Sequence, residues 1–150
     1  ALIVLANVPG CLFGGALIRR GATPAPMILT GTAIMAACTL GVFLPGPGVA
    51  VKVALCVAFS FFGGLVPPSL FTCVPRFAPS LRHVSAGNGM LMQGSSLGQF
   101  IGAPLVAAAV SLGSGDWVWA LGPMLVFCAL TALGAVLLGR QPSEGQARIV

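Results

Sequence analysis

Residues 117–139 read WVWALGPMLVFCALTALGAVLLG, a stretch without a single charged side chain. A helix needs about 20 predominantly apolar residues to cross the hydrocarbon core of a bilayer, and this stretch is long enough. The whole chain has the same character, because 57% of its 150 residues are hydrophobic, 6% are charged and the mean hydropathy is +1.05. A soluble domain carries roughly 25% charged residues, so this composition predicts an integral membrane protein and excludes a soluble or disordered chain.

The few charged residues divide the chain into long uncharged stretches. We therefore expect an all-α membrane protein, a polytopic bundle of five transmembrane helices over residues 2–18, 24–44, 49–74, 86–112 and 117–138. Ser85 is placed to cap the fourth helix. The bundle would occupy residues 1–140, and residues 141–150 would form a polar cytoplasmic tail. Because the sequence begins inside a hydrophobic run and without Met, we interpret it as a fragment of a longer protein.

The distribution of arginine predicts the orientation in the membrane. If the five helices alternate in direction, the connections after the first, third and fifth lie on one side. These connections hold all the arginines, namely Arg19, Arg20, Arg76, Arg82, Arg140 and Arg148. The opposite side receives only Lys52 and Asp116. Short loops rich in Lys and Arg stay in the cytoplasm, so we expect the arginine side to be cytoplasmic and the protein to lie in the cell (inner) membrane.

The spans contain almost no groups that could carry out chemistry. No Asp, Glu, Lys, Arg or His lies deep in any expected helix, and the single histidine, His83, has no Cys, Asp or Glu nearby. The five cysteines lie far apart without CxxC spacing, which argues against a zinc site and against a disulfide framework. We therefore expect no enzyme, no metal and no cofactor. The basic residues are also too scattered for a nucleic-acid surface.

Polar side chains inside the expected helices are the candidates for a functional site. A helical projection of the fourth helix places Asn88, Ser95, Ser96 and Gln99 on one arc, and Asn7 is the carboxamide of the first helix. A buried amide in hydrocarbon costs several kcal/mol unless it finds a partner, so these groups should face protein or a water-filled cavity. Two interpretations stay open: the groups line a substrate path, or they form hydrogen bonds that hold the helices together.

Glycines occupy the arc beside these polar residues. Gly94, Gly98 and Gly102 form a GxxxGxxxG run, a pattern that lets another helix approach closely. We expect these three glycines to serve helix packing.

The third expected helix contains the run Gly63-Gly64-Leu65-Val66-Pro67-Pro68. Pro67 removes the hydrogen bond to the carbonyl of Gly63, and Pro68 removes the one to Gly64. Broken membrane helices of this kind often mark a substrate site or a gate in transporters. A static kink, satisfied by neighbouring protein, is the alternative interpretation.

The run AGNGMLMQGSSLGQFIGAPL at residues 86–105 resembles the penultimate helix of major facilitator superfamily transporters. The turn GGALIRRG at residues 14–21 resembles the family's short basic cytoplasmic loop, and a final helix entered through Asp116-Trp117 fits the same plan. The resemblance implies that the five helices are the eighth to twelfth of a twelve-helix transporter. It also implies that the helices over 2–18, 49–74 and 86–112 line a central cavity, while those over 24–44 and 117–138 face lipid.

These features together predict a secondary transporter that works by alternating access and moves a small solute across the cell membrane. Asn7 and the polar arc of the fourth helix would contribute neutral hydrogen-bonding groups, and the Gly-Gly/Pro-Pro break would let the third helix flex. The expected partners are the lipid bilayer, a small-molecule substrate and the missing N-terminal half of the transporter. A five-helix half of a drug/metabolite-type carrier, a membrane-embedded enzyme and a non-transporting assembly subunit are the alternatives.

Overall fold

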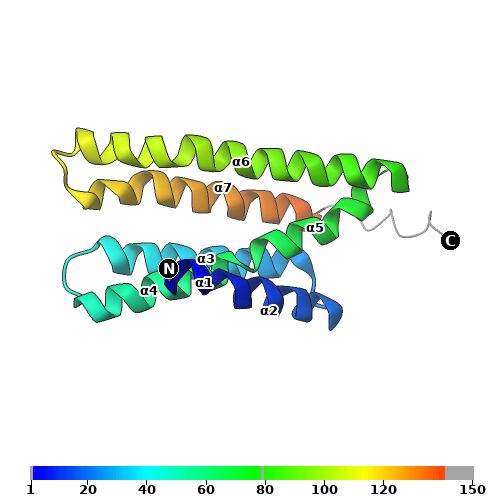
Figure 1. The fold of residues 1–150 in the computed structure, drawn as a ribbon, viewed down its shortest axis with the longest axis horizontal. Coiled ribbons are helices and arrows are strands. Elements are labelled where there is room, and N and C mark those ends of the chain that lie inside the picture. Colours follow the sequence, from blue (N-terminus) through cyan, green and yellow to red (C-terminus); the bar gives the residue numbers. More distant parts are fainter. Residues whose placement is uncertain (1, 79, 141–150) are drawn as a thin grey trace.

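A computed structural model describes residues 2–78 and 80–140, and these residues are almost entirely helical (Figure 1). The elements are α1 (Leu2–Leu5), α2 (Asn7–Arg19), α3 (Pro24–Phe43), α4 (Val49–Gly63), α5 (Val66–Phe77), α6 (Leu81–Leu112), the 3-10 helix η1 (Trp117–Ala120) and α7 (Leu121–Arg140).

The lengths of these helices suit a membrane. Four helical stretches of the described chain are long and apolar enough to cross a bilayer, namely Pro24–Phe43, Val49–Pro75, Arg82–Leu112 and Trp117–Arg140. Ile3–Arg19 forms a shorter apolar helix. The expectation of an all-α protein with membrane-type helices is confirmed.

The first expected helix, over 2–18, is interrupted at Ala6 rather than continuous. Pro9 explains the interruption, because it has no N–H to donate to the carbonyl of Leu5 and its ring crowds that carbonyl. The chain therefore ends α1 at Leu5 and begins α2 at Asn7.

The Gly-Gly/Pro-Pro run divides the third expected helix into α4 and α5. Helix α4 ends at Gly63, and α5 begins at Val66 with prolines in its first turn, where a missing N–H costs little. The amide of Gly64 still donates to the carbonyl of Ser60 at 3.1 Å, and the amide of Leu65 donates to Phe62 at 3.1 Å. Helix α4 therefore ends in a tightened last turn with i→i−3 bonds, and α5 begins at Val66.

Helix α6 begins at Leu81 rather than near residue 86. Ser80 takes the N-cap position with an extended backbone, whereas Ser85 lies inside the helix and donates to the carbonyl of Arg82 at 3.2 Å. Ser85 is therefore not the cap. Residues 81–86 contain neither Pro nor Gly, so nothing in this segment stops the helix from extending towards its N-terminus.

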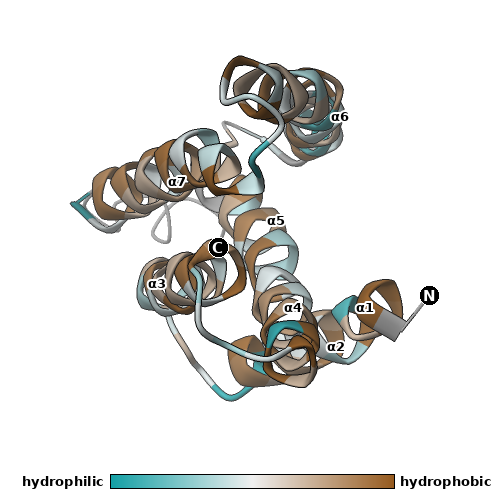
Figure 2. Ribbon diagram, turned by 90° about the vertical axis from the view of Figure 1, so that its left-hand side faces the viewer, coloured by the Kyte–Doolittle hydropathy of each residue, from teal (hydrophilic) through white to brown (hydrophobic). Residues whose placement is uncertain are grey.

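Helix α3 lies at the centre of the packing and α6 stands at its edge (Figures 1 and 2). Helix α3 packs against α7 and α4, and α2 packs against α4 and α5. About 33% of the span in α3 is buried, against 6% of the span in α6. This differs from the arrangement that the family resemblance implied, in which the helix over 24–44 would be an outer one.

Large apolar side chains cover the outside of the bundle. Phe100 is 79% exposed and Leu112 is 86% exposed, and many other Leu, Val and Phe side chains are similarly uncovered. In water the exposure of so much apolar surface would be unfavourable, whereas contact with lipid tails carries no such cost in free energy.

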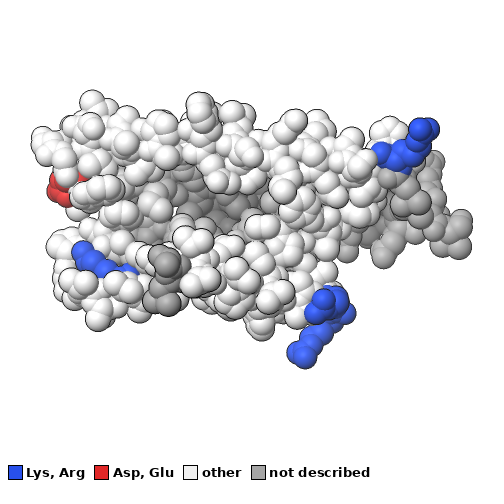
Figure 3. All heavy atoms as spheres, in the orientation of Figure 1, with Lys and Arg blue, Asp and Glu red and all other residues white. Residues whose placement is uncertain are grey.

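Basic and acidic side chains gather at the two ends of the bundle. The C-terminal ends of α2, α5 and α7 and the N-terminal end of α6 lie together at one end, and Arg19, Arg20, Arg82 and Arg140 belong to these segments (Figure 1). Figure 3 shows basic side chains over α2 and α6 at this end, whereas the other end carries an acidic side chain and also a basic one, since Lys52 lies in the first turn of α4. Arg148 and the expected polar tail over 141–150 lie outside the described residues.

Candidate functional site

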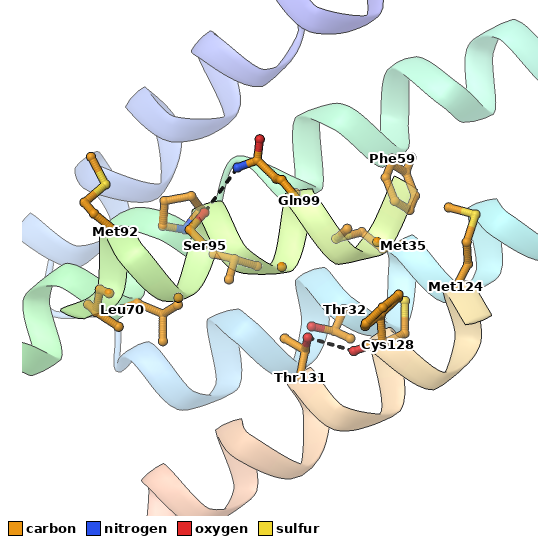
Figure 4. A pocket seen from close by; sticks show the side chains of 18 of the residues that line it. Thr32, Met35, Phe59, Leu70, Met92, Ser95, Gln99, Met124, Cys128 and Thr131 are labelled. Carbon is orange, nitrogen blue, oxygen red and sulfur yellow. Dashed lines mark hydrogen bonds between the residues drawn. The ribbon is translucent and has the colours of Figure 1, made fainter. Parts of the chain in front are cut away.

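A cavity of about 1130 Å³ lies between α6 on one side and α3, α4, α5 and α7 on the other (Figures 3 and 4). The lining is mostly apolar. It consists of Thr32, Met35, Phe59, Gly63, Val66, Pro67, Leu70, Phe71, Met90, Leu91, Met92, Gly94, Ser95, Gly98, Gln99, Gly102, Val106, Met124, Phe127, Cys128 and Thr131.

Two residues of the predicted polar arc of α6 line this cavity. Gln99 Nε2 donates a hydrogen bond to Ser95 Oγ one turn away, at 3.4 Å (Figure 4). This bond uses one amide hydrogen, so the Gln99 carbonyl oxygen and the other amide hydrogen can still bind a solute.

The residues of the α4–α5 break lie on two different sides of these helices. Gly63 and Pro67 line the cavity, whereas Gly64 and Pro68 lie against α2. A Cβ on Gly64 would come within 2.6 Å of the backbone oxygen of Asn7, and a Cβ on Gly14 would meet Pro68 Cγ at 3.0 Å. The same break therefore shapes one wall of the cavity and lets the α2 backbone approach closely.

Asn7 does not line the cavity but joins two helices. Its Nδ2 donates to the carbonyl of Ser60 at 3.1 Å, and its Oδ1 accepts a weak bond from Cys11 Sγ at 3.5 Å. Ser60 lies in the last turn of α4, immediately before the break. Of the two interpretations of the polar groups, the hydrogen-bonding one describes Asn7 in this structure.

Asn88 and Ser96 do not line the cavity either, although the helical projection placed them beside Gln99. Ser96 is exposed on α6. Asn88 is half-buried, and its Oδ1 has no hydrogen-bond partner among the described residues. Gly87, its neighbour, lies against Val74, which places this part of α6 next to α5.

The glycine run on α6 faces the cavity instead of a packed helix. A Cβ on Gly94 or Gly98 would meet nothing within 4 Å, and one on Gly102 would only touch the Phe127 ring at 4.0 Å. Within the described residues, no helix occupies the close-approach surface that the GxxxGxxxG run predicts.

Two threonines of the cavity wall were not identified from the sequence. Thr131 Oγ1 donates to the carbonyl of Phe127 at 2.8 Å, a common way for a helix to satisfy a hydroxyl. Thr32 is only 3% exposed, and in the described chain its Oγ1 has no hydrogen-bond partner. Both threonines lie close together in Figure 4. The sequence does not separate these two cases, because a threonine that bonds its own helix and one whose hydroxyl is buried without a partner look alike.

Methionines are concentrated in this cavity. Four of the five methionines, Met35, Met90, Met92 and Met124, line it. Methionine is flexible and polarisable, so such walls adapt to apolar surfaces of different shape.

The cavity offers hydrogen bonds and apolar contact but no charge. Its lining contains no Asp, Glu, Lys or Arg, and the described basic residues lie at the ends of the bundle or its connections. Across residues 2–78 and 80–140, no three His, Cys, Asp or Glu residues come together in a way that could hold a metal ion. The arrangement suits an uncharged or amphipathic occupant.

No family model, curated protein or solved structure matches this chain.

Proposed function

We propose that the protein is the C-terminal part of an alternating-access secondary transporter that moves a small uncharged or amphipathic solute across the cell membrane. The observation that carries this proposal is that a broken helix and a polar pair face one cavity within the membrane span. Gly63 and Pro67 of the α4–α5 break lie on one side, and Ser95 and Gln99 of α6 lie on the other.

Both parts have a physical role in transport. Irregular backbone at membrane depth is tolerated only where protein or a cavity satisfies it, and in transporters such breaks adjoin the substrate site. The Ser95–Gln99 pair supplies neutral donors and acceptors in a wall that is otherwise apolar. Binding by such a wall favours solutes that bury apolar surface and make a few hydrogen bonds.

The orientation and the family are part of the same proposal. The arginine-bearing helix ends would face the cytoplasm, and the chain would correspond to the eighth to twelfth helices of a major facilitator superfamily transporter. Support for this comes from the run at residues 86–105 and from the common end of the bundle at which Arg19, Arg20, Arg82 and Arg140 lie.

The test is transport by the full-length protein in membrane vesicles, with fluorescent amphipathic dyes and radiolabelled uncharged solutes as probes. We expect Gln99→Ala to lower the transport rate of a transported probe about 2- to 10-fold, the value of one lost hydrogen bond. Leu97→Ala is the matched control, because Leu97 is 58% exposed on the same helix and lies outside the cavity. Equal rates for the two variants, or no transport of any probe by the unaltered protein, would contradict the proposal.

A further inference from the structure

Three phenylalanine rings line the cavity without an aromatic partner. They are Phe59 of α4, Phe71 of α5 and Phe127 of α7. In the described chain, the ring–ring contacts are formed by other phenylalanines, none of which lines the cavity. Aromatic rings attract one another in offset-stacked or edge-to-face arrangements, with centroids about 4.5–7 Å apart. The three cavity rings can therefore offer this interaction to an occupant.

The Phe127 ring lies close to the polar pair of α6. Its Cε2 atom is 4.0 Å from the position that a Cβ on Gly102 would take, and the side chain is 37% exposed. Gly102 follows Gln99 by three residues, which is about 4.5 Å along the axis of α6. An occupant that is bonded to the Gln99 carboxamide is therefore within reach of the uncovered Phe127 ring.

Sulfur atoms form another part of the cavity wall. Met35 Sδ lies 3.7 Å from the position that a Cβ on Gly63 would take, so this thioether rests on the helix break. Met124 and Cys128 line the cavity from α7, one turn apart (Figure 4). Thioether sulfur makes favourable contacts with aromatic ring edges. A saturated occupant gains only its burial from these walls, whereas an aromatic occupant also gains ring and sulfur contacts.

The free hydrogen-bonding groups of the lining lie on α6. Ser95 and Gln99 bond one another and keep further donors and acceptors for an occupant. The Thr131 hydroxyl is used by its own helix, and Thr32 Oγ1 is buried in the protein rather than open to the cavity. Because no charged side chain lines the cavity, an ionised group would lose its hydration there without a counter-charge. The occupant therefore needs one neutral polar group on one side.

We propose that the solutes of this site are uncharged aromatic compounds with one neutral hydrogen-bonding group, such as aryl amides. Phe127 determines the preference for aromatic over saturated solutes. The neutral group of the solute bonds to Gln99, and its ring packs against Phe127. This substrate class rests on the proposed function, because the solute occupies the cavity that is assigned to transport.

Competition binding with a matched pair of amides tests the class. The radioligand is tritiated benzanilide, an uncharged amide with two aromatic rings, and the target is the purified full-length protein in detergent. The competitors are unlabelled benzanilide and N-cyclohexylcyclohexanecarboxamide, which has the same heavy-atom skeleton but saturated rings. The saturated amide has more apolar surface, so burial alone would favour it.

We expect benzanilide to compete at a concentration about 2- to 10-fold lower than the saturated amide, because only benzanilide makes ring contacts. Equal or stronger competition by the saturated amide, or no saturable binding of benzanilide, would overturn the proposal.

Phe127→Leu separates the effect of the ring from that of apolar bulk. Leucine keeps the wall apolar, so the affinity for benzanilide should fall about 2- to 10-fold while the affinity for the saturated amide stays the same. Phe100→Leu is the matched control, because Phe100 is 79% exposed on α6 outside the cavity, and it should change neither affinity. An equal loss for both amides in Phe127→Leu, or no loss for either, would overturn the role of the ring.

The vesicle assay separates this proposal from the transport function. Slower transport by Gln99→Ala than by Leu97→Ala, without an aromatic preference in binding, would support transport and overturn the aromatic solute class. An aromatic preference that depends on Phe127, with equal transport rates for Gln99→Ala and Leu97→Ala, would support the aromatic site and contradict the transport function.

Discussion

Gly64 is the residue on which the packing of α2 against the helix break depends. A Cβ at this position would lie 2.6 Å from the backbone oxygen of Asn7 and 2.8 Å from the backbone nitrogen of Cys11. These neighbours are backbone atoms, which cannot rotate away as a side chain would. The packing of α2 on the break therefore requires glycine.

Gly64→Ala should destabilise the folded protein by about 1–3 kcal/mol, because α2 must move away from the break. Thermal unfolding in detergent micelles, followed by circular dichroism, measures this. Gly89→Ala is the control: its Cβ would meet nothing within 4 Å, and alanine favours the helix by up to about 1 kcal/mol. Equal midpoints for the two variants would show that the close approach contributes nothing.

We expect Asn7 to contribute to stability rather than to the binding of the proposed solute. Asn7→Ala removes the donor to the carbonyl of Ser60 and should cost about 0.5–1.5 kcal/mol of unfolding free energy. Its neighbour Val8 is 57% exposed, so Val8→Ala should cost less. Because Asn7 does not line the cavity, the apparent affinity of Asn7→Ala for a transported probe should stay unchanged, and a weakened affinity would contradict this assignment.

At the scale of the element, the α4–α5 break is either a hinge or a static kink, and substitution of its two prolines distinguishes these interpretations. The double variant Pro67→Ala/Pro68→Ala restores two amide donors opposite the carbonyls of Gly63 and Gly64. We expect a more continuous helix and a transport rate lowered several-fold, measured in the vesicle assay. Pro104→Ala, inside α6 and outside the cavity, is the control. Unchanged transport by the double variant would show that the break is a static kink.

Several elements could be predicted from sequence because one strong signal determined each. The apolar run between Pro24 and Pro45 predicted the bounds of α3 closely, because a proline lies at each end, and the helix ends at Phe43. The adjacent Pro67 and Pro68 predicted the break between α4 and α5. The interruption at Ala6 was missed because a single proline, Pro9, can either bend or break a helix.

The cavity was predictable only in part. A helical projection orders residues around one axis, so it placed Ser95 and Gln99 correctly on a shared face but said nothing of what stands opposite them. Thr32 and Thr131 come from α3 and α7, and α3 also carries Thr30 and Thr39, so composition alone does not single out Thr32. Only the packing of α3 against α7 brings these two hydroxyls together with α6.

For the whole molecule, the orientation is open to direct measurement. In a variant whose native cysteines are replaced by alanine, Thr23→Cys lies at the arginine-rich end, and Pro45→Cys lies in the turn at the other end. A membrane-impermeant maleimide added to intact cells should label Pro45→Cys and leave Thr23→Cys unlabelled until the cells are permeabilised. The reverse pattern would invert the topology, and labelling of both would exclude a single orientation.

If the arginine-bearing end faces the cytoplasm, as proposed, the membrane voltage should influence how the molecule inserts. A living cell holds its interior negative, and moving one elementary charge across that field is worth about 2.3 kcal/mol per 100 mV. One end of the bundle carries Arg19, Arg20, Arg82 and Arg140. In the inverted topology each of these guanidinium groups would have to cross the membrane against the electric field. We therefore expect an energised membrane to disfavour the inverted form, and dissipation of the potential during synthesis to increase the inverted fraction.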